Sequence, residues 1–178
     1  ALGYPSVGRA APDFFDKARA WAVAVMLAAG VGGVIGSLLD WVTITPPPRG
    51  PGNVDFGREI ERSRPTVPFN GIEAADGWWT LGAGLLLGVA AVLLLVRRRA
   101  RYAWLGLLAA MLMGAVAIAD YRAIDDLRSS LSQRMDIVGD ADPALGITLV
   151  AGAALVGLIG AVAGVTATPH RETAREAP

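Results

Sequence analysis

Charged side chains are missing from four long stretches of this sequence. No Asp, Glu, Lys, Arg or His occurs in residues 21–39, 79–96, 103–119 or 145–165, and each stretch is 17 to 21 residues long. At about 1.5 Å of rise per residue, a helix of this length crosses the roughly 30 Å hydrocarbon core of a bilayer. Because hydrocarbon offers the backbone no hydrogen-bond partner, each stretch must be helical. The sequence therefore predicts an all-α, polytopic membrane protein, a bundle of four transmembrane helices.

Cysteine is also absent, and histidine occurs once, at His170. The lack of cysteine excludes a disulfide, a thiolate metal site and a cysteine-linked haem. No serine–histidine pair, glycine-rich phosphate loop or paired-acid constellation can be named, and Asp136, Asp140 and Asp142 lack the spacing of an EF-hand loop. Ionisable residues within the spans, the usual mark of proton or substrate pathways, are missing too. We therefore expect no enzymatic activity, no cofactor and no metal.

The charge is balanced overall but unevenly distributed along the chain. Sixteen basic and sixteen acidic residues give a net charge of zero, so we expect no nucleic-acid partner. Basic residues gather beside the ends of the spans, at Lys17, Arg19, Arg97, Arg98, Arg99, Arg101, Arg171 and Arg175. Short segments rich in arginine and lysine beside a span favour the cytoplasmic side. The pattern predicts a plasma-membrane protein with both termini cytoplasmic.

This topology divides the chain into three parts. Residues 1–20 form a cytoplasmic or interfacial segment, residues 21–165 the transmembrane domain, and residues 166–178 a polar cytoplasmic tail. Two long loops, residues 40–78 and 120–144, then lie on the outer side. The inner segments hold nine basic and four acidic residues against seven and twelve outside, which agrees with the assigned orientation.

Tryptophans stand at the ends of the spans. Indole rings, half apolar and half polar, settle at the membrane–water interface. We expect this anchoring role for Trp21, Trp41, Trp78, Trp79 and Trp104. A tryptophan-lined ligand site at Trp78 and Trp79 is the alternative, and the interfacial interpretation is favoured.

Small residues recur at four-residue spacing in every span. Glycine at this spacing lets helix backbones approach closely, which is how membrane helices gain dispersion contact. The candidate packing positions are Gly32, Gly36, Gly84, Gly88, Gly106, Gly114, Gly157, Gly160 and Gly164. They form either a docking face for a partner or the internal contacts of the bundle. Because all four spans carry the pattern, most of it must be internal, and a face that is left over would suit a partner.

The two outer loops differ in pattern. In the first, Asn70-Gly71 and Asp76-Gly77 are turn signals, and Asp76 is a candidate cap for the second span. In the second, apolar residues follow a helical period, which predicts that the third helix continues outside the membrane to about Gln133. The members of this stripe are Ile118, Tyr121, Ile124, Leu127, Leu131 and Met135.

Several short motifs stand at the outer ends of the spans. They are Asp40-Trp41-Val42, Asn70-Gly71, Asp76-Gly77-Trp78, Val138-Gly139 and Gly146. In this combination the chain resembles, over nearly its whole length, a group of small uncharacterised four-helix integral membrane proteins of actinobacteria. It has a weaker likeness to the tryptophan-operon-associated membrane proteins of the same bacteria. The resemblance implies the four-helix fold and assigns no catalytic residues.

These features favour a non-catalytic accessory or structural subunit of a larger bacterial membrane complex. A lipid-import or a respiratory assembly is a candidate host, by analogy alone. Its expected partners are membrane lipid and other integral membrane subunits. The alternative is a free-standing lipid or small-molecule carrier, for which four spans thinned by glycine offer room. An envelope sensor comes third, because the inner segments are short and hold no recognisable output domain.

Overall fold

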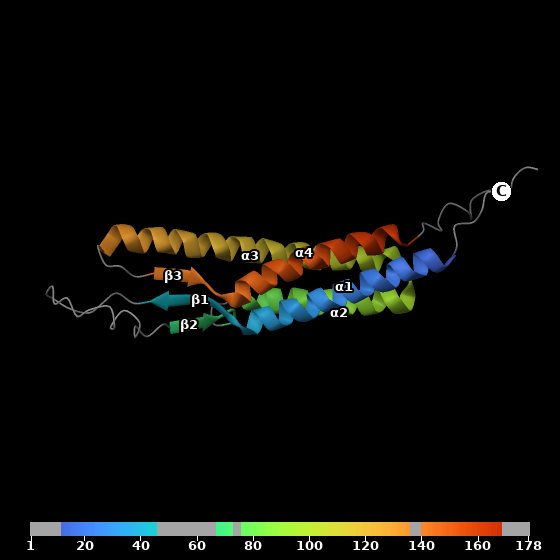
Figure 1. Ribbon diagram of the computed structural model, residues 1–178, viewed down its shortest axis with the longest axis horizontal. Helices are drawn as coiled ribbons and strands as arrows, with labels where there is room; N and C mark the ends of the chain where they lie inside the picture. The colour runs from blue at the N-terminus through green and yellow to red at the C-terminus, as the bar shows by residue number, and fades with distance from the viewer. Residues whose placement is uncertain (1–11, 46–66, 73–75, 136–139, 169–178) are drawn as a thin grey trace, which may run out of the picture.

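Four helices dominate the structure, a computed structural model that describes residues 12–45, 67–72, 76–135 and 140–168. They are α1 (Pro12–Leu38), α2 (Gly77–Arg97), α3 (Ala100–Met135) and α4 (Leu145–Thr166) (Figure 1). Each of the four is long and apolar enough to cross a membrane. The predicted set of four apolar spans is therefore confirmed, and the chain has the character of a multi-pass membrane protein.

The helices form a closed bundle in which neighbours along the chain lie side by side. Helix α1 packs against α2 and α4, and α3 packs against the same two. Only Arg98 and Arg99 connect α2 to α3, and Arg98 takes a left-handed conformation with φ of 53° to end α2. Helix α1 begins and α4 ends at this same end of the bundle, which we call the basic end (Figure 1).

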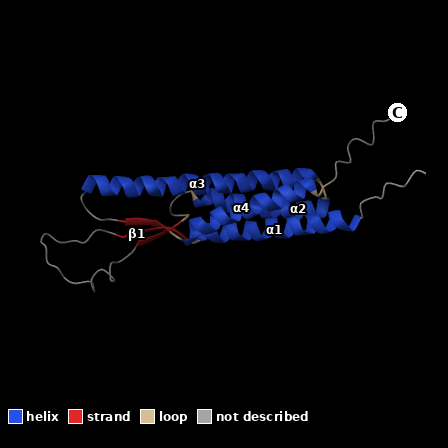
Figure 2. Cartoon of the chain, turned by 45° about the horizontal axis from the view of Figure 1, so that its top comes forward, coloured by secondary structure: helices blue, strands red, loops and turns tan. Residues whose placement is uncertain are grey.

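A small antiparallel sheet lies at the opposite end, which we call the sheet end (Figure 2). Its strands are β1 (Asp40–Thr45), β2 (Val67–Asn70) and β3 (Asp140–Pro143), in the order β2-β1-β3. The prediction of an all-α protein missed this sheet. The strands fall within the segments predicted as outer loops. Strand β1 follows α1 directly, so the chain enters the sheet as soon as it leaves the bundle.

Helix α3 is the longest element and extends past the bundle beside the sheet (Figure 1). Its apolar span ends at Asp126, and the helix continues to Met135, close to the predicted end at Gln133. Helix α1 begins at Pro12, a residue favoured in the first turn, so residues 12–20 are helical and continuous with the first span. Asp136, Val138-Gly139 and His170 lie outside the described residues.

The predicted glycines hold the helices together from inside. Gly84 on α2 meets α1 so closely that a methyl group on it would lie 3.0 Å from the Gly30 carbonyl oxygen. A methyl group on Gly36 would lie 3.0 Å from the Gly146 carbonyl oxygen on α4, and one on Gly32 would touch Ala153. Side chains of neighbouring helices fill the space beside Gly106, Gly114, Gly157, Gly160 and Gly164.

Gly88 takes part through its backbone alone. A methyl group on Gly88 would meet nothing within 4 Å, but the Gly88 amide nitrogen lies 3.1 Å from the place that a methyl group on Gly30 would occupy. The small-residue pattern thus serves the internal packing of the bundle. These glycines therefore do not form the alternative, a docking face for a partner.

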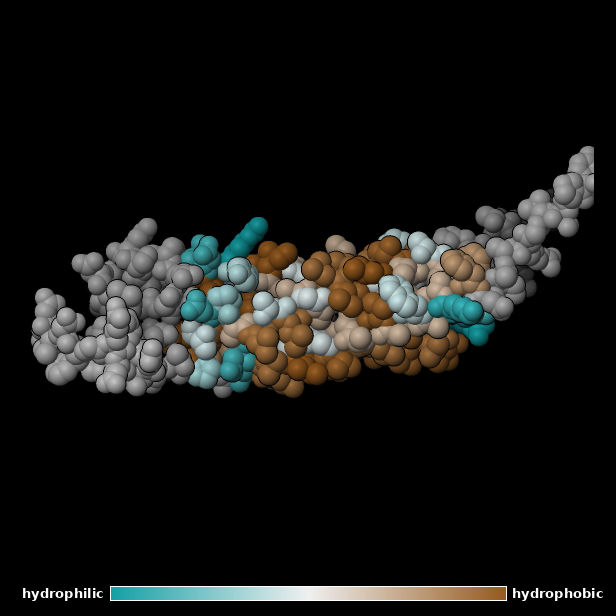
Figure 3. Space-filling view, in the orientation of Figure 1, coloured by the Kyte–Doolittle hydropathy of each residue, from teal (hydrophilic) through white to brown (hydrophobic). Residues whose placement is uncertain are grey.

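Apolar side chains cover the outside of the bundle as well as its interior. Figure 3 shows them as a belt along the bundle, with hydrophilic residues toward both ends. Leu85, Val89 and Val92 of α2 are among the exposed members. An apolar exterior between two polar ends is the surface that a bilayer requires.

Candidate functional site

Trp41 lies buried where the bundle meets the sheet. Strand β1 pairs Asp40 with Asn70 and Val42 with Phe69, so Trp41 is an extra residue in a β-bulge. A bulge re-aims the side chain at the irregularity. Here the indole ring is only 2% exposed, although the residue belongs to a three-stranded sheet at the end of the molecule.

The indole nitrogen of Trp41 closes the end of α1. It donates a hydrogen bond of 2.8 Å to the carbonyl oxygen of Gly36, which is one of the last four carbonyls of that helix and has no partner within it. The main chain of Trp41 is engaged too, because its carbonyl accepts the Ala144 amide at 2.8 Å just before α4. Trp41 therefore ties α1, β1 and the start of α4 together.

Two glycines make room for the ring. A methyl group on Gly146, in the first turn of α4, would lie 2.7 Å from Cδ1 of Trp41, and one on Gly71 would overlap Nε1 and Cε2 of the same ring. Gly71 also accepts a 2.9 Å hydrogen bond from the Gly77 amide at the start of α2. We call Trp41, Gly36, Gly71 and Gly146 the tryptophan junction. Most of the motifs that carry the family resemblance meet at or beside it.

A pair of hydroxyl groups is buried between α1 and α2 near this junction. Ser37 and Thr80 are both fully buried, and their oxygens lie 2.8 Å apart. Ser37 also reaches the Gly33 carbonyl at 2.7 Å, and Thr80 reaches the Gly77 carbonyl at 2.9 Å. The pair has two hydroxyl protons for these three contacts. At least one hydroxyl group therefore donates to a carbonyl of its own helix, and the other donates either to its own helix or to its partner hydroxyl.

Two carboxyl groups meet at the same end of the bundle. Asp76, just before α2, and Asp120, on α3, lie close enough for their side chains to interact. Oδ2 of Asp120 is buried and has no partner within the described part of the chain. A hydrogen bond between two carboxyl groups requires a proton on one of them. The sequence interpretation found no paired acids, because these two are 44 positions apart (120 − 76).

Asp76 does not act as the predicted helix cap. It occupies the N-cap position of α2, but its side chain makes no capping hydrogen bond. Its backbone is helical, with φ −86° and ψ −16°, whereas capping side chains usually start from an extended backbone. The Asp76 carboxyl group is thus free to meet Asp120 instead of the amides of α2.

Replacing Asp120 with Asn tests the shared proton. An asparagine amide donates to the Asp76 carboxylate without needing that proton, so we expect Asp120→Asn to keep the melting temperature in mild detergent at neutral pH, or to raise it by the equivalent of up to about 1 kcal/mol. Asp125→Asn, at an exposed position one turn along the same helix, is the control and should change nothing. A clear loss of stability in Asp120→Asn alone would show that the two groups are not paired.

The predicted interfacial tryptophans fall into two groups. Trp21, Trp78, Trp79 and Trp104 are 54% to 62% exposed at the two ends of the bundle, as anchoring at an interface requires. Trp41 departs from this expectation, because its ring is inside the protein and its N–H is used by Gly36. In the sequence, Trp41 stands at the end of a span just as the other four tryptophans do. The bulge that turns its ring inward has no signal of its own in the sequence.

No group of three or more His, Asp or Glu side chains that could hold a metal ion occurs within the described residues. Asp142, one of the residues weighed for calcium, lies in strand β3. At the sheet end, the described side chains offer hydrogen-bonding groups and the contact between the Asp76 and Asp120 carboxyl groups.

The fold and this junction define a multi-pass membrane protein whose four-helix bundle carries a small sheet at one end. The sequence matches no model of a known protein family, and no curated protein matches it. The resemblance to the actinobacterial four-helix proteins therefore stays a prediction.

Proposed function

We propose that this protein is a non-catalytic accessory subunit of a larger membrane complex and that it docks through its sheet end. The observation that carries the proposal is the outer edge of strand β2. Within the described residues, β2 pairs only with β1, whereas the opposite side of the sheet is covered because α3 packs along β3. Among the described residues, one edge of the sheet is covered by α3 and the other edge pairs with no further strand.

The exposed edge is apolar. Val67 is 47% exposed and Phe69 is 37% exposed, although both lie in a strand of the sheet. Pro68 between them has no N–H to offer, which is typical of an edge strand. Sheet edges accept an added strand from a partner, with main-chain hydrogen bonds for affinity and side-chain contacts for specificity. A membrane subunit with an extended segment outside the bilayer fits this edge.

The same proposal includes the orientation of the protein in the membrane and the complex that it joins. The arginines of the basic end favour the cytoplasm by the positive-inside rule, which places the sheet and the extension of α3 outside, with both termini inside. A partner at the sheet end is then reached from the outer side of the plasma membrane. Lipid-import and respiratory assemblies of actinobacteria are the hosts that we propose.

A mild-detergent pull-down of the tagged protein from its native host tests the docking edge. We expect stoichiometric membrane partners with the natural sequence and their loss, by at least tenfold, with Phe69→Lys, because a charge on an apolar contact must be desolvated. Tyr121→Lys is the matched control, since Tyr121 is 53% exposed on α3 and away from β2. Equal recovery of partners with both variants would reject the edge, and an unchanged level of free protein in a host-deleted strain would reject subunit status.

A lipid carrier is the second candidate, supported by an apolar cavity of about 310 Å³ between α1 and α4. The same pull-down separates the two functions. Recovery of the protein with lipid and without stoichiometric proteins would favour the carrier.

A further inference from the structure

The apolar cavity lies at the basic end of the bundle, between the start of α1 and the end of α4. Four residues of α1, among them Phe14 and Trp21, line one side, and Ala163 and Thr166 of α4 line the other together with Ala167, which follows that helix. Phe14 is 69% exposed and Trp21 is 54% exposed, so the cavity opens to the surroundings of the bundle. Thr166 adds no free donor, because its hydroxyl group bonds to the Ala163 carbonyl at 3.0 Å.

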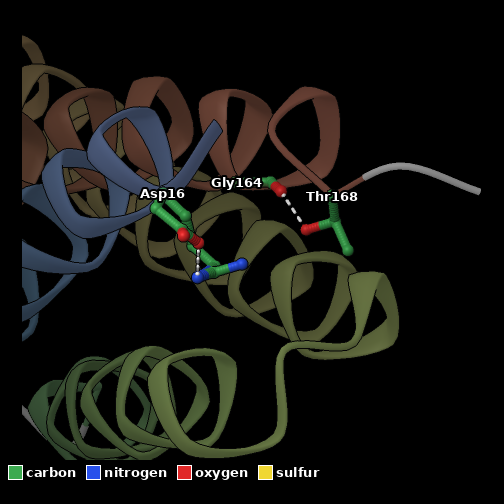
Figure 4. Close-up of polar contacts among 4 residues, drawn as sticks. Asp16, Gly164 and Thr168 are labelled. Atoms are coloured by element: carbon green, nitrogen blue, oxygen red, sulfur yellow. Dashed lines mark hydrogen bonds and ion pairs between the residues drawn. The ribbon is translucent and has the colours of Figure 1, made fainter. Parts of the chain in front are cut away.

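The end of α4 is closed beside this cavity. Thr168 donates its hydroxyl proton to the Gly164 carbonyl at 2.8 Å, which satisfies one of the unpaired carbonyls of the last turn (Figure 4). Asp16 of α1 lies beside that end of α4 in the same view and forms an ion pair with Arg19. The hydroxyl groups of Thr166 and Thr168 and the charges of Asp16 and Arg19 thus have partners, and the walls of the cavity are left to apolar contacts.

Basic side chains gather at the end of the bundle where the cavity lies. The basic side chains that the structure describes at this end are Lys17, Arg19, Arg97, Arg98, Arg99 and Arg101. Arg19 is held by Asp16. Arg101 lies over the ring of Tyr102, 4.9 Å from its centre, and donates to its hydroxyl group at 2.9 Å. An anionic ligand would therefore be attracted most strongly by the basic side chains that lack such a partner.

Among the basic residues without a described partner, Lys17 lies in the segment of α1 that lines the cavity, next to Ala18. It is exposed, and it has no ion pair within the part of the chain that the structure describes. In a helix, residues three and four apart share a face, so Lys17 lies on one stripe with Phe14 and Trp21. A lysine can lay its apolar stem along such a stripe and keep its ammonium group in the polar headgroup layer.

We propose that this cavity is a binding site for one anionic phospholipid. An acyl chain lies against Phe14, Trp21 and Ala163, and Lys17 holds the phosphate. The volume of about 310 Å³ is at the lower limit of ligand pockets, which suits part of one bound lipid. Basic pockets between membrane helices are known to take acidic headgroups. This inference does not depend on the accessory-subunit proposal, which concerns the opposite end of the molecule.

Native mass spectrometry of the full-length protein in mild detergent tests the site, with phosphatidylglycerol and phosphatidylcholine added in equal amounts. We expect one phosphatidylglycerol to be retained in preference to phosphatidylcholine. Lys17→Gln should lower that preference about fivefold, the effect of one lysine beside an anionic lipid. Arg97→Gln removes the same charge from the same end but away from the cavity, and it should lower the preference less than twofold.

A steric pair of variants tests the apolar half of the site. Ala163→Phe fills the cavity and should abolish retention of phosphatidylglycerol, whereas Ala151→Phe, at an exposed position on the same helix, should leave it unchanged. Equal losses in Lys17→Gln and Arg97→Gln would replace the site by a diffuse attraction to the basic end. Equal retention of the two lipids by the natural sequence would overturn the proposal outright. Neither result would affect the pull-down that tests the sheet edge.

Discussion

Gly84→Leu is expected to prevent the bundle from folding, whereas Gly82→Leu, two residues earlier on the same helix, should leave it intact. A methyl group on Gly84 would already lie 3.0 Å from the Gly30 carbonyl oxygen and 3.1 Å from the Val34 amide nitrogen. These are backbone atoms of α1, so they cannot rotate away as a side chain would. A leucine there forces α1 and α2 apart, at a cost of about 3 kcal/mol or more.

Gly82 is the matched control because it faces away from the protein. It is exposed, and a methyl group on it would meet nothing within 4 Å. Leucine is a better helix former than glycine by up to about 1 kcal/mol, so Gly82→Leu should be neutral or slightly stabilising. Size-exclusion chromatography in mild detergent, followed by a thermal melt, compares the two variants. A monodisperse Gly84→Leu protein with an unchanged melting temperature would contradict the observed packing of α1 on α2.

Gly30 extends this argument to a position that the four-residue spacing did not select. A methyl group on Gly30 would lie 2.9 Å from the Gly84 carbonyl oxygen, closer than real side chains come. The sequence gives a signal here, since Gly30, Gly32 and Gly33 lie together, but spacing rules cannot say which of three glycines meets the neighbour. That depends on how the two helices are rotated about their own axes, which only the assembled bundle fixes.

The four spans were predictable because their signal is local. A stretch of about 20 apolar residues has a single stable conformation in a bilayer, whatever surrounds it. The continuation of α3 to Met135 followed from its helical period and was confirmed. The sheet was not predictable in the same way, because β2 and β3 are four residues each and pair with a strand far away in the sequence. Short segments of this kind carry little periodic signal.

The polar features of the sheet end illustrate the same limit. Asp76 and Asp120 each looked like an ordinary residue at the end of a span, and their contact arises only because α2 and α3 are neighbours in the bundle. Ser37 and Thr80 meet for the corresponding reason between α1 and α2. Sequence patterns place such residues at a depth along the membrane axis, and the helix arrangement then decides which of them touch.

The second large effect is expected for Trp41. Removing the ring with Trp41→Ala should cost about 3–5 kcal/mol, the range for a buried tryptophan in a packed core, and should leave the sheet end loosely attached. Trp41→Phe keeps much of the ring but removes the indole N–H, so the Gly36 carbonyl loses its partner. That smaller change should cost about 1–3 kcal/mol, the price of an unsatisfied buried group.

Trp79→Ala is the control that distinguishes the effect of removing a buried ring from the effect of removing any tryptophan. Trp79 is 62% exposed at the same end of the bundle, so its removal deletes an interfacial contact without opening a cavity. Melting temperatures in mild detergent should fall in the order Trp79→Ala, Trp41→Phe, Trp41→Ala, with the last losing the most. If Trp41 were exposed like the other four tryptophans, Trp41→Ala and Trp79→Ala would lose equal stability. The ranking thus decides whether the junction between bundle and sheet is held from within.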